Sequence, residues 1–150
     1  GMHILIAEDN ELNMEIAQFV LESAGAVLSR AMNGKEALEC FQASAPGTFD
    51  VILMDVMMPV MDGFEATRAI RALDREDAKT IPIIAMTANA FAEDRKCAFE
   101  AGMNEHLAKP LESRQMKEVI AAYRGKKMQA DSTAQPGSEV QPDGGTGSEK

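Results

Sequence analysis

Five side chains that could do chemistry fall at the ends of short apolar runs in this sequence. They are Glu8, Asp9, Asp55, Thr87 and Lys109. The runs that precede them lack alternation, which is typical of strands buried on both faces of a parallel sheet. Because the carboxyl ends of parallel strands meet at one edge, and ligands bind there, we expect these five side chains to lie together.

Three carboxylates at one edge require a compensating positive charge. Two carboxylates about 4 Å apart repel by roughly 4 kcal/mol at an effective dielectric constant near 20. Lys109 offsets part of this repulsion, and an all-oxygen site of Glu8, Asp9 and Asp55 suits Mg²⁺, with Mn²⁺ as the alternative. Zinc is disfavoured because no soft ligand accompanies the acids.

The same set of side chains is equipped to attack phosphorus. The metal and Lys109 would neutralise the transferring group, Thr87 would add a hydroxyl, and Asp55 would act as the nucleophile. The predicted product is an aspartyl phosphate.

The stretch from Val51 to Gly63 positions the nucleophile. It begins with four consecutive apolar residues and reaches Asp55 at the end of the predicted strand. Pro59 cannot donate to a sheet ladder, and Asp62 with Gly63 forms a turn signal. The chain therefore leaves the sheet directly after Asp55.

The other elements follow from hydrophobic periodicity and turn residues. Strands are expected over 3–7, 27–31, 81–86 and 105–109, and helices over 35–43, 64–73, 90–101 and around 116–123. A helix capped by Asn10 or Asn13 and ended by Gly25 is expected to bury Ile16, Ala17, Val20, Leu21 and Ala24. The charged residues 74–79 are expected to form an exposed loop.

Five strands that alternate with five helices predict an α/β protein. Such alternation implies right-handed crossovers, so the helices cover both faces of a parallel sheet. Residues 1–124 are expected to form one domain. Residues 125–150 are rich in Gly, Ser, Pro, Gln and Asp, so they are expected to be a disordered tail or linker.

Composition narrows the class of partner and the compartment. The chain has 150 residues, 45% of them hydrophobic, with a net charge of −9. This acidity argues against nucleic acid as a partner, because phosphate backbones are bound by an excess of Lys and Arg. The two cysteines, Cys40 and Cys97, have no metal-ligand spacing, and no signal peptide or long apolar run is present. We therefore expect a soluble, cytoplasmic protein without direct membrane contact.

Four separated motifs resemble the receiver domains of two-component response regulators. They are the acid pair at residues 8–9, the Asp55 segment with its Met-Pro turn, Thr87-Ala88, and Lys109-Pro110. The likeness covers residues 3 to about 124. The residues within these motifs are most similar to those of receivers attached to hybrid sensor histidine kinases. Such a parent kinase can be membrane-anchored.

The resemblance implies a fold, a set of roles and a set of partners. The fold would be a flavodoxin-like, doubly wound (βα)5 sheet with strand order 2-1-3-4-5. Asp55 would be the phosphoacceptor, and Glu8, Asp9, Asp55 and the backbone carbonyl of Met57 would hold the metal. Thr87 and Lys109 would bind the phosphoryl group. The phosphodonor would be a histidine kinase or a histidine phosphotransfer domain, and the receiver would be a monomer or weak dimer that catalyses only its own phosphorylation and dephosphorylation.

Three further residues are assigned by the same resemblance. The family usually has Tyr or Phe as a switch residue where this chain has His106. A switch role and a plain half-buried strand residue are equal alternatives at this position. Met57 and Asn89 flank the expected path of attacking water, so they are expected to tune the lifetime of the phosphoryl group.

Other functions make different demands on these residues. A stand-alone single-domain response regulator that acts by docking stays open as an alternative to a hybrid-kinase fragment. A phosphatase of the aspartate-nucleophile class would want an acid where Met57 stands, and a nucleotide- or flavin-binding domain would want glycines where Glu8 and Asp9 would repel phosphate. A receiver-like module that is never phosphorylated would lack site residues, and none is missing.

Overall fold

The structure is a computed structural model that describes residues 2–88, 92–109 and 111–133. This part of the chain contains five strands and six helices. In chain order they are β1 (His3–Ala7), α1 (Glu11–Ser23), β2 (Val27–Ala31), α2 (Gly34–Ala43), β3 (Val51–Asp55), α3 (Gly63–Arg71), α4 (Glu76–Thr80), β4 (Ile83–Thr87), α5 (Ala92–Ala101), β5 (Glu105–Ala108) and α6 (Ser113–Thr133).

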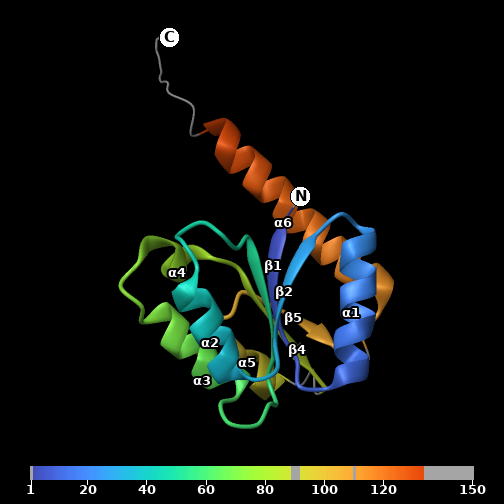
Figure 1. The fold of residues 1–150 in the computed structure, drawn as a ribbon, viewed down its shortest axis with the longest axis vertical. Helices are drawn as coiled ribbons and strands as arrows, with labels where there is room; N and C mark the ends of the chain where they lie inside the picture. The colour runs from blue at the N-terminus through green and yellow to red at the C-terminus, as the bar shows by residue number, and fades with distance from the viewer. Residues whose placement is uncertain (1, 89–91, 110, 134–150) are drawn as a thin grey trace, which may run out of the picture. The chain divides into compact units, whose positions relative to one another are not determined.

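All five strands are parallel and form one sheet in the order β2-β1-β3-β4-β5. Figure 1 shows α1 on one face of this sheet and α2, α3 and α5 on the other. The predicted doubly wound fold and its strand order 2-1-3-4-5 are therefore confirmed. The central strands β3 and β4 are buried along their whole length, as expected of strands covered on both faces.

The strand register brings the predicted site residues to one edge. Ala7 of β1 pairs with Met54 of β3, so the residues that follow, Glu8 and Asp55, come side by side. At the other side of the sheet, Thr87 pairs with Ala108, so Lys109 follows directly. The site is thus specified by pairing between strands rather than by any local motif.

The face covered by α2 and α3 holds a continuous hydrophobic core. It contains Leu5, Ile52 and Met54 from the sheet, and Phe41 and Ile70 from the helices, all fully buried. Burying an aliphatic or aromatic side chain of this size contributes about 1.5–3 kcal/mol to folding. The β3 end that carries Asp55 is therefore anchored on a rigid element.

The first helix turns a different face to the sheet than expected. Its N-cap is Asn10, whose side chain accepts from the N–H of Asn13, so the first of the two predicted caps is used. The buried residues are Met14, Ala17, Val20 and Leu21, whereas Ile16 is 40% exposed. The prediction of Ile16 in the core was wrong, because the helical period through Ala17 and Leu21 reaches Met14 instead. Leu12 and Phe19 are also exposed.

Residues 76–80 form a helix where an exposed loop was predicted. Arg75 precedes this helix and donates from Nε and one terminal nitrogen to both carboxylate oxygens of Asp77. Its other terminal nitrogen donates to the carbonyls of Phe41 and Ser44 at the end of α2, and the guanidinium lies 4.5 Å from the centre of the Phe41 ring. Hydrogen bonds from Arg75 lower the pKa of Asp77 to about 2. These long-range contacts order a segment that is charged in sequence.

The last helix is longer than expected. It starts at Ser113 and continues to Thr133, past the predicted start of the tail at residue 125. The extension includes Lys126, Lys127, Gln129 and Ala130, which are good helix formers. Residues 118–150 form a unit separate from residues 1–117. The domain boundary at residue 124 stays a prediction, and residues 134–150 lie outside the described part.

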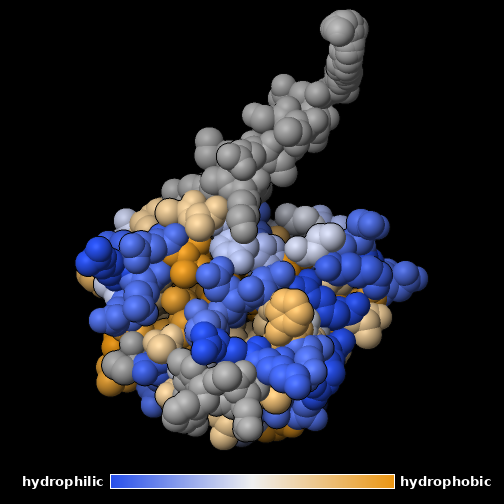
Figure 2. All heavy atoms as spheres, turned by 180° about the vertical axis from the view of Figure 1, so that it is seen from behind, coloured by the Kyte–Doolittle hydropathy of each residue, from blue (hydrophilic) through white to orange (hydrophobic). Residues whose placement is uncertain are grey.

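The surface is mainly hydrophilic on the face seen in Figure 2, where hydrophobic residues occur in small patches between hydrophilic ones. Among the described helices, none has both the length and the hydrophobicity needed to cross a membrane.

Candidate functional site

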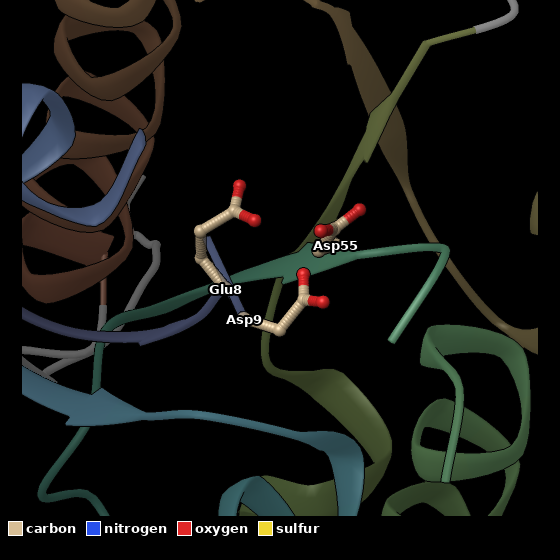
Figure 3. Close-up of side chains that lie close together, drawn as sticks. All are labelled: Glu8, Asp9 and Asp55. Carbon is tan, nitrogen blue, oxygen red and sulfur yellow. The ribbon is translucent and has the colours of Figure 1, made fainter. Parts of the chain in front are cut away.

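Three carboxylates converge at the carboxyl edge of the sheet. Figure 3 shows Glu8 and Asp9, from the loop after β1, beside Asp55 at the end of β3, with their carboxylates directed into the same space. One oxygen of each group lies within 4.8 Å of the others. Glu8 is fully buried, Asp55 is 2% exposed, and Asp9 is exposed to solvent. The cluster is thus shielded from solvent at Glu8 and Asp55 and reached by solvent at Asp9.

Lys109 supplies the positive charge of the site. Its Nζ lies 2.9 Å from Oδ2 of Asp55 and 3.0 Å from Oε1 of Glu8. Burial acts to lower the pKa of Lys109, but its bonds to Asp55 and Glu8 outweigh that effect and raise the pKa. The ammonium therefore keeps its charge next to the two buried acids.

Asp55 is harder to ionise than an ordinary aspartate. Its pKa is raised to about 6, first by burial and then by a hydrogen bond and charge repulsion with Glu8, while Lys109 acts in the opposite direction. One ammonium is therefore too little positive charge for this set of acids. Without a further cation, a proton is retained by Asp55 up to about pH 6.

The donor set fits a hard divalent cation. Oε1 of Glu8 is buried and pairs with the Lys109 ammonium, which also pairs with Asp55. Buried carboxylate charges are costly unless cations compensate them, and here two buried acids share one ammonium. Three carboxylates, one of them open to water, match the preference of Mg²⁺ for oxygen ligands and retained waters.

The loop after β3 is held close to Asp55. The N–H of Met57 donates to Oδ1 of Asp55 over 3.2 Å, while the Met57 side chain is 76% exposed. Asp62 and Glu65 form a capping box that starts α3. Asp62 and Gly63, predicted as a turn, are the N-cap and the first residue of α3, and the N–H of Gly63 donates to the carbonyl of Val56.

The other predicted site residues lie at different distances from the acids. Thr87 is buried at the end of β4, and its carbonyl accepts from the N–H of Lys109 over 2.8 Å, which joins the ends of β4 and β5. His106 is half-buried on β5 and lines a pocket with Arg95 and Phe99, whose lining includes none of Glu8, Asp9 and Asp55. Asn89 lies outside the described residues.

Two features of this edge were not found from the sequence. Val60 has a positive φ of 70°, and Gly34 of α2 contacts the loop after β3. The only signal for Gly34 was the Asn33-Gly34 pair, which predicts a local turn. Its contact with a segment distant in sequence could not be read from that pair.

The family of this chain is shown by a match to a family model. The family model of the response regulator receiver domain matches residues 4–121. The chain belongs to this family. The matched receiver domain includes the whole described sheet except His3, the first residue of β1, and it includes each of the residues Glu8, Asp9, Asp55, Thr87 and Lys109.

Curated relatives of this receiver domain include sensor kinases. It is 38% identical over 123 residues to the sensor protein GacS of Pseudomonas syringae pv. syringae, covering 81% of this chain and 13% of GacS. It is 37% identical over 123 residues to the hybrid signal transduction histidine kinase L of Dictyostelium discoideum, covering 80% of this chain and 7% of the kinase. The chain thus spans a small part of the length of these relatives.

Solved structures give the same family. The receiver domain of the sensor histidine kinase PA1611 from Pseudomonas aeruginosa PAO1 matches with a TM-score of 0.74 and 38% identity, covering 83% of this chain and 98% of that one. That structure has a magnesium ion coordinated in its active-site cleft. A chain in the co-crystal of the Saccharomyces cerevisiae histidine phosphotransfer protein Ypd1 with the Ssk1 receiver domain matches with a TM-score of 0.76 and 28% identity, covering 84% of this chain and 90% of that one.

Proposed function

We propose that Asp55 of this receiver domain accepts a phosphoryl group from a phosphohistidine of a kinase or phosphotransfer protein. The observation that carries the proposal is the 2.9 Å contact between Lys109 Nζ and Oδ2 of Asp55, within a cluster of three acids of which Glu8 and Asp55 are buried. A nucleophile needs its charge held at the point of attack, and the incoming phosphoryl oxygens need a cation beside it.

Magnesium is the proposed cofactor. Glu8, Asp9, Asp55 and the backbone carbonyl of Met57 would hold it, and when bound it would neutralise charge on the transferring phosphoryl group. The buried carboxylates of Glu8 and Asp55 share the one ammonium of Lys109, which supports this assignment, and so does the magnesium ion in the PA1611 receiver. No observation favours Mn²⁺ over Mg²⁺.

The chain's own residues have distinct tasks in the proposed transfer. A carboxylate oxygen of Asp55 forms the new bond to phosphorus, and the bond from phosphorus to the histidine nitrogen breaks, with its electron pair leaving on the imidazole. Lys109 and the hydroxyl of Thr87 hold the phosphoryl oxygens. Asp55 must be deprotonated to attack, so its raised pKa ties the reaction to the cation that displaces its proton.

The proposal is tested with acetyl phosphate as a small-molecule donor. We expect the intact chain to gain one phosphoryl group in the presence of Mg²⁺ and none when the metal is chelated, as measured by mass spectrometry. The adduct should be removed by hydroxylamine, because that reagent cleaves acyl phosphates. Labelling that survives both hydroxylamine and chelation would contradict the proposal.

The exposed apolar residues of α1 support a docking surface for the phosphodonor. Leu12, Ile16 and Phe19 recur at helical spacing and are 64%, 40% and 74% exposed. They lie on one face of the helix that begins directly after the acid loop. We infer that an apolar helix face of a phosphotransfer protein packs here and presents its phosphohistidine to Asp55.

Replacing Phe19 with Ser should separate docking from chemistry. Transfer from a phosphohistidine protein is expected to slow about tenfold, because a central aromatic contact of an interface is typically worth more than about 1 kcal/mol. Labelling by acetyl phosphate should stay unchanged, since that donor needs no docking surface. Glu39→Ser, at an exposed position of α2 on the other face of the sheet, is the matched control. Equal slowing with both donors would place Phe19 outside a docking role.

We propose that the parent of this receiver is a hybrid sensor histidine kinase. The curated relatives are sensor kinases, and the chain matches only 7% and 13% of the length of two of them. A receiver that is one part of a longer kinase fits this better than a stand-alone response regulator. A phosphatase is disfavoured because Met57 stands where that class places a second acid. The switch role of His106 stays a prediction, supported by its place in the pocket beside α5.

A further inference from the structure

The loop between β3 and α3, residues 56–62, contains a strained turn. Val60 has a φ of 70°, and the N–H of Met61 donates to the carbonyl of Pro59 over 2.7 Å. A hydrogen bond between residues i and i+2, with a positive φ at the residue between them, defines the rare, strained form of the γ-turn. A β-branched residue is poorly suited to this conformation, and the Val60 side chain is 77% exposed. Packing of Val60 itself therefore does not hold the turn.

The turn is instead held from α2. The N–H of Gly34, the first residue of that helix, donates to the carbonyl of Met61 over 2.9 Å. A Cβ at position 34 would lie 2.3 Å from the same carbonyl oxygen and 2.9 Å from that of Asp62. The backbone at Gly34 lies outside the left-handed region. Glycine is therefore required at position 34 because a Cβ would clash with the loop, and not because the backbone has a positive φ.

The same loop makes the only described backbone contact with the Asp55 side chain among the residues that the structure covers. The N–H of Met57 donates to Oδ1 of Asp55, and the carbonyl of Met57 is the proposed metal ligand. At its far end the loop is pinned by Gly63, where a Cβ would lie 2.3 Å from the carbonyl oxygen of Asp55. A shift of the loop at Met61 would therefore act on the segment that carries Met57.

We propose that Gly34 is a positioning residue for phosphorylation at Asp55. By lacking a side chain, it lets α2 hold the loop in its strained turn, which sets the N–H and the carbonyl of Met57 beside Asp55. This inference rests on the proposed phosphoacceptor function, since it assigns Gly34 a part in the geometry of that site. Gly34 touches none of the reacting groups itself.

Gly34→Ala tests the proposal, because the two possible roles give opposite results. Alanine is the better helix former, so a residue that matters only to α2 would be neutral or stabilising when replaced. A residue that holds the loop should instead move the amide NMR signals of Met57, Met61 and Asp62 in metal-free protein. It should also weaken Mg²⁺ binding about tenfold, as changes that disturb the support of metal ligands do. Lys35→Ala, one residue further along the helix, is the control.

A second background keeps the test decisive if Gly34→Ala alone folds poorly. Val60→Gly frees the turn, so the loop can yield to a methyl group at position 34. The loss of Mg²⁺ affinity caused by Gly34→Ala should then be at least about threefold smaller in the Val60→Gly background. An equal loss in both backgrounds, or unmoved loop amides, would overturn the proposal.

The proposed function and the role of Gly34 fail in distinguishable ways. If Asp55 is not a phosphoacceptor, the native chain will not be labelled by acetyl phosphate, whatever residue stands at position 34. If only the inference fails, the native chain will be labelled normally, and Gly34→Ala will match it in Mg²⁺ affinity and in the loop signals.

Discussion

Asp55→Asn should take up no phosphoryl group from acetyl phosphate or from a phosphohistidine protein. An amide cannot act as the nucleophile, although it has nearly the same shape, so labelling should fall at least about a hundredfold. Intact-protein mass spectrometry after incubation with Mg²⁺ measures this directly. The fold should persist, because the substitution removes one of several buried charges that repel each other at neutral pH.

The matched control is Asp74→Asn, an exposed acid after α3. It should be labelled as fully as the native chain. Circular dichroism should show that both variants keep the native helix content. Full labelling of Asp55→Asn at another acid of the cluster would mean that the nucleophile was wrongly assigned.

Magnesium binding should weaken about tenfold for each pH unit below about 6. The cation binds the ionised form of Asp55, whose pKa is raised to about 6 by burial and by Glu8. Above that value the group is ionised and affinity is flat; below it a proton must leave before the cation binds. An ordinary aspartate, with a pKa near 3.9, would leave the affinity flat down to about pH 5. Calorimetric titration at about pH 7.5, about pH 6 and about pH 5 tests the onset.

Glu8→Gln tests whether the charge of Glu8 sets the pH at which Mg²⁺ affinity begins to fall, as distinct from lowering that affinity at every pH. It removes the neighbouring charge that helps to raise the pKa of Asp55, so the decline should begin at lower pH. Its affinity at neutral pH should also be lower, because a proposed ligand has lost its charge. A native affinity that is constant from about pH 7 to about pH 5 would contradict the prediction, and so would an unchanged onset in Glu8→Gln.

Much of the site could be predicted because it follows from simple rules. Glu8, Asp55 and Thr87 each follow an apolar run that is typical of a buried strand, and parallel strands bring their carboxyl ends to one edge. Lys109 was predicted on the same ground. The structure places Glu8, Asp9, Asp55 and Lys109 in contact range because the strand register leaves them no other position.

What was missed depends on contacts between segments far apart in the chain. The burial of Met14 in place of Ile16 is decided by how α1 lies on the sheet, which local periodicity fixes only to within a residue or two. The short helix α4 depends on the bonds from Arg75 to α2. The turn at Val60 contradicts the residue's own preference and is explained only by the contact with Gly34.

The contacts of Lys109 join residues that are 101 and 54 positions apart in the chain. A chain leaving the ribosome therefore has its acids long before their ammonium, and β5 is the last strand of the sheet to be made. The buried acids Glu8 and Asp55 therefore gain the ammonium of Lys109 only when β5 pairs with β4, so the charge of the site is balanced by the part of the sheet that is made last.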